Sequence, residues 1–218
     1  MKISEIFESI QGEGNTIGRI SLFIRVQGCP LDCIWCDSKY SVSFKEGIEK
    51  TKKEIIDTIN LFVKNKNGII VFTGGEPLYY QKEIAEILKE VETSSIEFET
   101  SGIYLPIEEL KKYKFNVSPK LSGAKLSGGK LIYTKIYSNL KEFVKLNSIF
   151  KFVISTPEEL KEVKEIIQKY NIPKEKVFLM PEGTKIEELV EKSKYILPFC
   201  LEEGINYSFR LQILLRIK

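Results

Sequence analysis

The sequence predicts an α/β fold in which about six parallel strands form an incomplete, TIM-like β/α barrel. Short runs rich in Ile, Val and Phe alternate with amphipathic stretches, and this alternation favours a parallel sheet with right-handed crossovers. Clusters of polar residues and glycines follow most of the apolar runs. Because six strand-and-helix pairs fall short of the eight that close a full barrel, we expect a partial one.

The expected elements follow one another in order, and each has its own pattern. The strands are short β-branched or aromatic runs, which we place at residues 21–26, 69–73, 96–100, 115–118, 150–155 and 177–181. The helices are amphipathic stretches, which we place at residues 52–64, 82–92, 107–112, 140–146, 157–170 and 186–195. Residues 157–170 show the pattern well, since Leu160, Val163 and Ile166 recur at helical spacing.

Length and composition favour a single domain over residues 1–218. Hydrophobic residues make up 43% of the chain, which is enough for a sizeable core. The net charge is +3, which implies no strong field for direct binding of nucleic acid or of a membrane surface. No apolar run approaches the roughly 20 residues of a membrane span. With no apolar leader and with cysteines expected to be reduced, we expect a cytoplasmic protein.

Three of the four cysteines, Cys29, Cys33 and Cys36, follow the first expected strand with the spacing Cys-x3-Cys-x2-Cys. Three thiolates on one loop can hold three corners of an iron–sulfur cube, whereas a fully ligated ferredoxin-type cluster takes four cysteines. We therefore expect a [4Fe–4S] cluster with one iron open to a substrate or cofactor. A structural zinc site is the alternative, but it needs four ligands and the chain has no histidine. Cys200 lies in an apolar stretch and is expected to be a buried core residue.

A second motif, Gly74-Gly75-Glu76-Pro77, follows the strand expected at residues 69–73. Adjacent glycines let the backbone approach a ligand closely and adopt positive φ, and the Glu76 carboxylate can meet an ammonium group. An ordinary strand-to-helix turn is the alternative. Further polar clusters follow other strands, at residues 99–102, 118–120 and 180–183. Since the carboxyl ends of parallel strands meet at one face, we expect these clusters to share one site with the cysteines.

The cysteine spacing and the Gly-Gly-Glu-Pro motif together resemble the radical S-adenosylmethionine (radical SAM) superfamily. Residues 5–14 (EIFESIQGEG), 23–28 (FIRVQG) and 35–38 (WCDS) extend the resemblance to the 7-carboxy-7-deazaguanine synthase family. The similarity covers residues 3–40 closely and continues in the short anchors at 73–78, 99–102 and 118–120. It implies that the single domain is a radical SAM core.

The resemblance also implies a reaction and its cofactors. The enzyme would be a carbon–nitrogen lyase that converts 6-carboxy-5,6,7,8-tetrahydropterin to 7-carboxy-7-deazaguanine with loss of ammonia, in 7-deazapurine (queuosine or archaeosine) biosynthesis. A [4Fe–4S] cluster and S-adenosylmethionine would supply the radical, while the protein supplies orientation and electrostatics. Family members further imply Mg2+, a homodimer, and an electron donor such as flavodoxin or ferredoxin.

Individual site residues follow from the same resemblance. Cys29, Cys33 and Cys36 would bind the cluster, and Ser38 would bind Mg2+, a hard cation that prefers oxygen ligands. The residues expected to contact the substrate are Ile10, Gln11, Gly12, Glu13, Arg25 and Thr73. Those expected to contact S-adenosylmethionine are Trp35, Asp37, Gly74, Gly75, Glu76, Ser118, Pro119 and Lys120.

Several of these residues also have simpler interpretations. Arg25 suits a substrate carboxylate, because a guanidinium binds a carboxylate through two parallel hydrogen bonds; a surface ion pair is the alternative. Ser38 could instead be a helix N-cap, and residues 11–13 a glycine turn with solvated side chains. The chain departs from the family at Leu211-Gln212-Ile213-Leu214, where many members carry Leu-Gln-x-His. The role of this segment therefore stays open.

Two other functions stay open on the sequence. An activating enzyme that makes a glycyl radical on a partner protein shares the cysteine spacing, but it needs a docking surface for a large chain in place of a pterin pocket. A non-catalytic zinc or redox-sensing module needs only the cysteines. Arg25 and the turn at residues 11–13 favour a small acidic substrate.

Overall fold

A computed structural model of the chain describes residues 1–93 and 95–218. Its nine strands form one sheet in the order β3-β1-β2-β4-β5-β6-β7-β8-β9. The strands are β1 (Lys2–Ile10), β2 (Ile20–Val26), β3 (Ile48–Glu49), β4 (Ile69–Gly74), β5 (Ile96–Thr100), β6 (Lys114–Val117), β7 (Ser148–Ile154), β8 (Val177–Pro181) and β9 (Asn206–Tyr207). The α-helices are α1 (Lys52–Asn65), α2 (Gln81–Leu88), α3 (Gly129–Val144), α4 (Glu159–Tyr170), α5 (Ile186–Glu203) and α6 (Leu211–Leu215).

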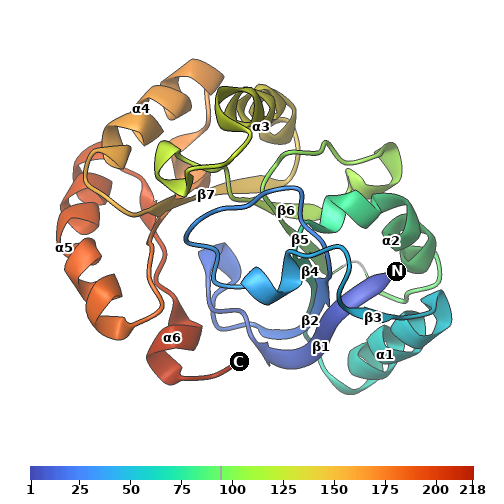
Figure 1. The fold of residues 1–218 in the computed structure, drawn as a ribbon. Helices are drawn as coiled ribbons and strands as arrows, with labels where there is room; N and C mark the ends of the chain where they lie inside the picture. The colour runs from blue at the N-terminus through green and yellow to red at the C-terminus, as the bar shows by residue number, and fades with distance from the viewer. Residues whose placement is uncertain (94) are drawn as a thin grey trace.

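Strands β2 and β4 to β8 pair in parallel with their neighbours, which confirms the expected set of six parallel strands. The short β9 adds to β8 in parallel, while β1 pairs with β2, and β3 with β1, in antiparallel fashion. Figure 1 shows the sheet curving around a central space, with α1 to α5 on its outer side. The architecture is therefore the partial, TIM-like barrel predicted from the sequence.

Side chains alternate along the parallel strands, so apolar rings face the helices and polar groups face the barrel interior. Phe72, Phe98 and Phe115 stand on β4, β5 and β6, with neighbouring ring centroids 5.4 and 5.3 Å apart. All three are fully buried in the main hydrophobic cluster, together with residues of the outer helices. Glu97 and Glu99 flank Phe98 on β5 and therefore point the other way, into the barrel.

Two predicted helices differ from the structure. Residues 107–112 form only a short 3-10 helix, Glu108–Leu110, because β6 begins too soon after them for a longer helix. The helix expected at residues 140–146 is the second half of α3, which already begins at Gly129. Two adjacent glycines at the start of α3, each a poor helix former, hid this beginning in the sequence.

The strand β1 was not predicted, because charged residues interrupt its apolar pattern. Within the sheet these charges have partners. Glu5 pairs with Arg25 of β2 at 2.8 Å, and Glu8 pairs with Lys66, which follows α1.

Residues 208–218, which we call the C-terminal segment, lie against the N-terminal part of the chain. The amide of Leu211 donates to the carbonyl of Gly12 at 3.0 Å, and the Lys218 ammonium pairs with Glu5 at 2.5 Å. Figure 1 accordingly places α6 and the C-terminus near β1. The segment thus covers the side of the barrel between its first and last long strands.

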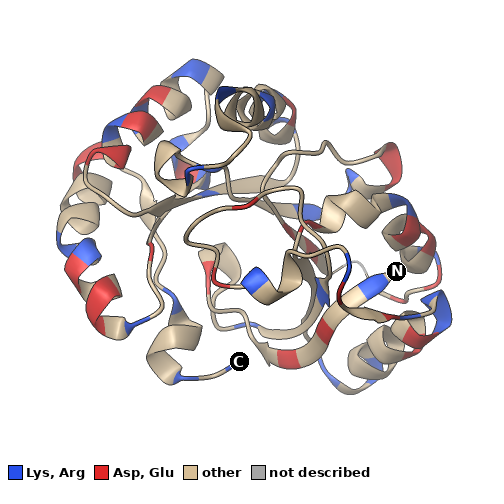
Figure 2. Ribbon diagram, viewed as in Figure 1, with Lys and Arg blue, Asp and Glu red and all other residues tan. Residues whose placement is uncertain are grey.

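Acidic and basic residues are mixed over the outer helices, as Figure 2 shows, in keeping with a net charge of +3. Within the described residues, no helix combines the length and the apolar character needed to cross a membrane. The side chains that form the candidate site lie inside the barrel.

Candidate active site

A cavity of about 510 Å³ opens at the carboxyl ends of the parallel strands. Its walls come from these strand ends, from residues 28–38, which we call the cysteine loop, and from the C-terminal segment. The residues assigned from the sequence that line it are Ile10, Gln11, Gly12, Glu13, Arg25, Cys29, Cys33, Trp35, Cys36, Asp37, Ser38, Thr73, Gly74, Gly75, Ser118 and Lys120. Glu76 and Pro119 are the two assigned residues that do not.

The cysteine loop brings Cys29, Cys33 and Cys36 to this cavity as free thiols. The loop is held from its outer side by residues 124–127: the amide of Ile34 donates to the Ala124 carbonyl at 3.1 Å. Cys200 is also free but lies in the hydrophobic core, as expected, with its Sγ 3.6 Å from the Asn206 carbonyl oxygen. The three clustered cysteines therefore have no fourth cysteine beside them on the cavity.

This donor set fits an iron–sulfur cluster with one open iron. Burial raises the pKa of the Cys29 thiol to about 12 and also raises the pKa of Cys33. Bound iron would supply the positive charge that stabilises the thiolates. Beside them the indole Nε1 of Trp35 is buried without a hydrogen-bond partner. Over residues 1–93 and 95–218, no three His, Cys, Asp or Glu side chains are arranged to hold a single metal ion.

Gly74 and Gly75 bring the end of β4 against the start of the cysteine loop. The amide of Gly75 donates to the Val26 carbonyl at 3.0 Å, and that of Glu76 to the Gly28 carbonyl at 2.9 Å. A Cβ on Gly75 would lie 2.1 Å from the Gly28 oxygen, and Gly74 has a φ of +112°. Because neither position accepts a side chain without backbone movement, the glycine pair fixes the loop relative to the sheet.

The Glu76 carboxylate does not face the cavity, contrary to the expectation that it meets an ammonium group there. It is fully buried, and Oε1 accepts hydrogen bonds from the Leu78 amide at 3.1 Å and the Thr100 hydroxyl at 2.7 Å. Oε2 accepts from the amide and hydroxyl of Ser101 at 2.9 and 2.6 Å. Glu76 therefore positions Thr100 and Ser101, which do line the cavity.

We expect Glu76→Gln to lower the stability of the protein by about 2–3 kcal/mol. Each carboxylate oxygen accepts a backbone N–H, so either orientation of the amide sets an NH2 group against a donor. The corresponding loss in Tm is about 4–12 °C for a chain of this size. The exposed Glu83→Gln on α2 is the matched control, and equal thermal unfolding temperatures for the two variants would refute this arrangement.

Arg25 is anchored through its Nε, which donates to Glu5 Oε1 at 2.8 Å. Its guanidinium carbon lies 5.9 Å from the ring centroids of both Phe7 and Tyr40. Burial opposes ionisation of Glu5, but hydrogen bonds from Lys218, Tyr40 and Arg25 lower its pKa. The ion pair that the sequence offered as the alternative is therefore present, with Glu5 as the partner of Arg25. Among the described contacts it uses only the Nε of the guanidinium. The two terminal nitrogens stay available to a carboxylate in the cavity, which Arg25 lines.

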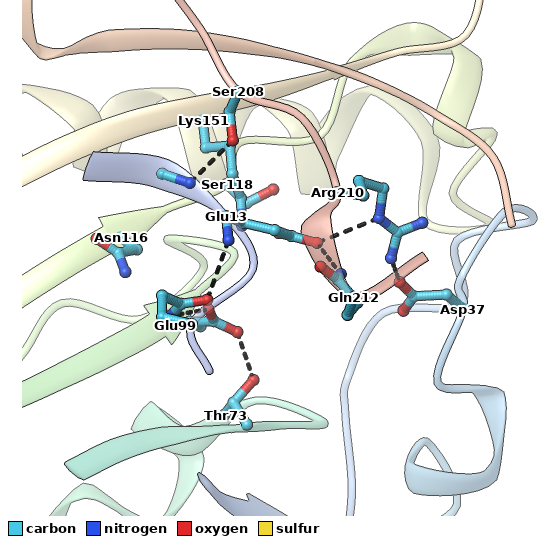
Figure 3. A network of polar contacts seen from close by, with 12 residues as sticks. Glu13, Asp37, Thr73, Glu99, Asn116, Ser118, Lys151, Ser208, Arg210 and Gln212 are labelled. Atoms are coloured by element: carbon cyan, nitrogen blue, oxygen red, sulfur yellow. Dashed lines mark hydrogen bonds and ion pairs between the residues drawn. The ribbon is translucent and has the colours of Figure 1, made fainter. Parts of the chain in front are cut away.

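Glu13 is the centre of a buried charge network (Figure 3). Its Oε1 accepts hydrogen bonds from Arg210 Nε at 3.2 Å and Gln212 Nε2 at 2.7 Å, and its Oε2 pairs with Lys151. Arg210 also pairs with Asp37 of the cysteine loop. Burial would raise the pKa of Glu13, but Lys151 and Arg210 outweigh it and lower the pKa to about 2. Two carboxylates and two cations therefore balance one another at the cavity wall.

We expect Glu13 to contribute to the loss of stability in acid. Its folded-state pKa of about 2 lies below the ordinary value of 4.5, so the carboxylate stabilises the fold above pH 4.5 and loses this effect as the pH falls toward 2. Glu13→Gln should therefore show a shallower decrease of Tm from about pH 5 to about pH 3 than the wild-type protein. Parallel decreases in the two proteins would contradict these ion pairs.

The cluster at residues 99–102 was expected in the site, but Glu99 had no individual role assigned from the sequence, and Asn116 was not singled out. Glu99 accepts hydrogen bonds from Gln11 Nε2 at 3.1 Å and from the Thr73 hydroxyl at 2.7 Å. Asn116 Nδ2 donates to Glu97 at 3.0 Å, while its Oδ1 is buried without a partner. Glu99 and Asn116 both line the cavity, so these contacts form part of its wall.

Three further residues of the site, Lys151, Arg210 and Gln212, were also missed as site residues. Lys151 had a visible signal, because it is the only charged residue of the otherwise apolar strand β7. Arg210 had none, since its partner Glu13 lies at the opposite end of the chain. Gln212 had one, its place in the segment that matches the Leu-Gln of the family's Leu-Gln-x-His, but no contact could be assigned to it from the sequence. The Oε1 of Gln212, like Asn116 Oδ1, is buried without a partner.

The residues expected to contact S-adenosylmethionine lie together beside the cysteine loop. The Lys120 ammonium donates to the Ser118 hydroxyl at 3.0 Å and lies 5.3 Å from the Trp35 ring centroid. Ser38 is buried, with its Oγ 3.8 Å from Cys36 Sγ. Its side chain makes no capping hydrogen bond to the 3-10 helix that follows (Lys39–Ser41), so the N-cap alternative does not account for it.

Comparison with known proteins places the chain among radical SAM proteins. The family model of the radical SAM superfamily matches residues 23–181. The 7-carboxy-7-deazaguanine synthases of Pyrobaculum aerophilum and Hyperthermus butylicus are 37% and 30% identical to it, over 98% and 100% of this chain and 94% and 93% of theirs. The crystal structure of QueE from Escherichia coli matches the fold with a TM-score of 0.69 at 22% identity, covering 96% of this chain and 93% of that one. Streptococcus suis SuiB bound to S-adenosylmethionine matches with a TM-score of 0.55 at 14% identity, over 84% of this chain and 44% of that one.

Membership of this superfamily implies a [4Fe–4S] cluster and S-adenosylmethionine as cofactors, and the three free cysteines on the cavity fit that chemistry. The expectations of fold, superfamily and family drawn from the sequence are confirmed. From the matched residues and the near full-length similarity, the chain belongs to the radical SAM superfamily and, within it, to the 7-carboxy-7-deazaguanine synthase family.

Proposed function

We propose that this protein is a 7-carboxy-7-deazaguanine synthase, which converts 6-carboxy-5,6,7,8-tetrahydropterin to 7-carboxy-7-deazaguanine with loss of ammonia. One observation carries the proposal: a single cavity is lined both by the three free cysteines and by the anchored Arg25. An acidic substrate held by that guanidinium lies in the same enclosed space as the cluster and its cofactor.

The substrate binds with its carboxylate on Arg25, through the two terminal nitrogens that the pair with Glu5 leaves open. Its ring system presents alternating N–H donors and acceptors. Gln11, Glu13 and Thr73 also line the cavity and supply matching groups, together with the backbone of residues 10 and 12. Thr73 is the neighbour of Arg25 across the pair of strands β2 and β4.

The carboxylate of Glu99 and the side chains of Asn116 and Gln212 add polar groups to the cavity wall. A substrate ring that hydrogen-bonds to such groups gains binding free energy and specificity. These three residues extend the set expected from the sequence.

S-adenosylmethionine binds between the cysteine loop and the strand ends. The backbone at Gly74 and Gly75 lines its methionine part, and Ser118 and Lys120 hold its ribose and carboxylate. Trp35 and Asp37 lie on the adenine side. When bound, the cluster and this cofactor supply the radical, while the protein holds both ligands in place and excludes water.

Ser38 is the proposed Mg2+ ligand, because a hydroxyl suits a hard cation and its Oγ makes no capping bond. Ser38 is the last residue of the cysteine loop and lines the cavity, so the ion would lie beside both ligands.

A small substrate accounts for the cavity better than a partner protein does. The C-terminal segment contributes Arg210, Gln212 and Ile213 to the cavity wall and contacts the chain near Gly12 and Glu5. A glycyl-radical activating enzyme would need this side of the site open to a large chain.

The rest of the assignment follows from the family. The chain acts as one radical SAM domain over residues 1–218, in the cytoplasm, as a homodimer, and receives electrons from flavodoxin or ferredoxin. Its product enters queuosine or archaeosine biosynthesis, without direct binding of nucleic acid. An anaerobic assay with 6-carboxytetrahydropterin, S-adenosylmethionine, reductant and Mg2+ tests the activity, and failure to form the deazaguanine product would exclude it. A colourless, zinc-containing protein would instead support a non-catalytic module.

Cluster binding should depend on Cys29, Cys33 and Cys36 and not on Cys200. Replacing any of the first three by Ala should abolish iron retention and the brown colour after anaerobic reconstitution, because each loses a thiolate ligand. Cys200→Ala is the matched control, since its thiol lies in the core away from the cavity. Iron and sulfide analysis measures the outcome, and a Cys200 variant that loses its iron would contradict the three-cysteine site.

Arg25→Ala should raise the apparent substrate constant by roughly thirty- to several-thousand-fold, since truncating one partner of a desolvated charge pair costs about 2–5 kcal/mol. Arg25→Lys should recover only part of this, because an ammonium lacks the two-pronged geometry. Uncoupled cleavage of S-adenosylmethionine should persist in both variants. The exposed Arg19→Ala is the charge-matched control. If Arg25→Ala binds the pterin normally yet fails to cleave the cofactor, Arg25 has been assigned to the wrong ligand.

A further inference from the structure

Arg210 joins three parts of the chain that are far apart in sequence. Its Nε donates to Glu13 at 3.2 Å, and one terminal nitrogen donates to the carbonyl of Gly183 at 2.5 Å. The other terminal nitrogen pairs with Asp37. These contacts reach the loop after β1, the loop after β8 and the cysteine loop, and Figure 3 shows Arg210 between Glu13 and Asp37.

The side chain of Arg210 is only 8% exposed, whereas that of Asp37 is 45% exposed. Asp37 is therefore a surface carboxylate that a nearly buried guanidinium draws inward. Charge-assisted hydrogen bonds of this kind are among the stronger polar contacts in proteins. Among the described residues, this contact is the one ion pair that ties the cysteine loop to the C-terminal segment.

A second path runs from the other end of the C-terminal segment to the same loop region. Lys218 pairs with Glu5 at 2.5 Å, and Glu5 accepts a hydrogen bond from the Tyr40 hydroxyl at 2.9 Å. Tyr40 lies just after the cysteine loop. The segment thus contacts the loop region on both sides of Ser38, directly through Arg210 and indirectly through Glu5.

The fold does not depend on Arg210 to neutralise Glu13, because Lys151 pairs with the same carboxylate. Removing the guanidinium would leave Glu13 paired and would let the half-exposed Asp37 return to solvent. What is lost is the connection between the two segments. We therefore expect the loss of Arg210 to affect the relative position of the two segments more than the stability of the whole fold.

We propose that Arg210 is a positioning residue that couples the order of the cysteine loop to the seating of the C-terminal segment over the cavity. The C-terminal segment then becomes ordered against the cavity at the same time as the cysteine loop becomes ordered at Asp37. Such coupling is reciprocal, so loosening either partner loosens the other. The consequence of this coupling for catalysis rests on the proposed function. The C-terminal segment would cover the bound pterin at the same time as the cysteine loop takes its position beside S-adenosylmethionine.

Hydrogen–deuterium exchange on the full-length, cluster-loaded protein without substrate tests the coupling. In Arg210→Gln, amides of residues 36–42 and of residues 208–218 should both exchange at least about tenfold faster than in the wild-type protein. Arg216→Gln removes the same charge from an exposed position of the same segment and should change neither region. Faster exchange of residues 208–218 alone in Arg210→Gln would overturn the proposal.

The reciprocal variant is Asp37→Ala, which should speed exchange in residues 208–218 as well as in its own loop. Arg210→Lys should restore protection in part, because one ammonium cannot reach all three partners. The same measurement on cluster-free, full-length protein keeps the test valid if a variant loses iron. Unchanged exchange of residues 208–218 in Asp37→Ala would also overturn the coupling.

Activity separates this inference from the proposed function. If the enzyme turns over the pterin, Arg210→Gln should raise its apparent KM about tenfold or more, and Arg216→Gln should not. If the wild-type enzyme turns over the pterin but Arg210→Gln does not speed exchange in both segments, the role of Arg210 is refuted and the proposed function stands. Coupled exchange in a protein that never turns over the pterin would refute the proposed function and leave the coupling intact.

Discussion

The close approach of Gly75 to Gly28 determines where the cysteine loop lies. A Cβ on Gly75 would be 2.1 Å from the Gly28 oxygen, and backbone hydrogen bonds from Gly75 and Glu76 join β4 to this part of the chain. Cys29 follows Gly28 directly, so the distance of all three thiols from the strand ends depends on the contact between Gly75 and Gly28. Any side chain at position 75 would displace the loop before it disturbed the barrel.

The interior of the barrel is polar because the strands alternate their side chains. On β5, Phe98 packs toward the helices while Glu97 and Glu99 face inward. Buried charges destabilise a fold unless they are paired, and the inward charges here have partners: Glu97 with Lys114 at 2.9 Å, and Glu99 with two hydrogen-bond donors. Pairing lets the protein keep a hydrophilic cavity inside an apolar shell.

The sequence predicted the six parallel strands and the cysteine loop because their signals are local. An apolar run or a cysteine spacing can be read within a short window. The segments that complete the site carry no such signal, because their meaning comes from distant partners: Arg210 meets Glu13 across 197 positions. The motif that contains Glu76 was recognised, but the direction of its side chain depends on Thr100, the last residue of β5, and on Ser101, which follows it.

The C-terminal segment has a place in the site without the histidine that many family members carry there. Leu214 stands at the position of that histidine and is 46% exposed. Gln212 packs against Gly12, where an added Cβ would lie 2.0 Å from the Gln212 Oε1. A glycine at position 12 is therefore what admits Gln212 to the cavity. Lys151 and Arg210 hold the pKa of Glu13 well below its ordinary value, so its carboxylate stays ionised as an acceptor. Its oxygens accept from Arg210, Gln212 and Lys151, and this network fixes the C-terminal segment against the turn at residues 11–13.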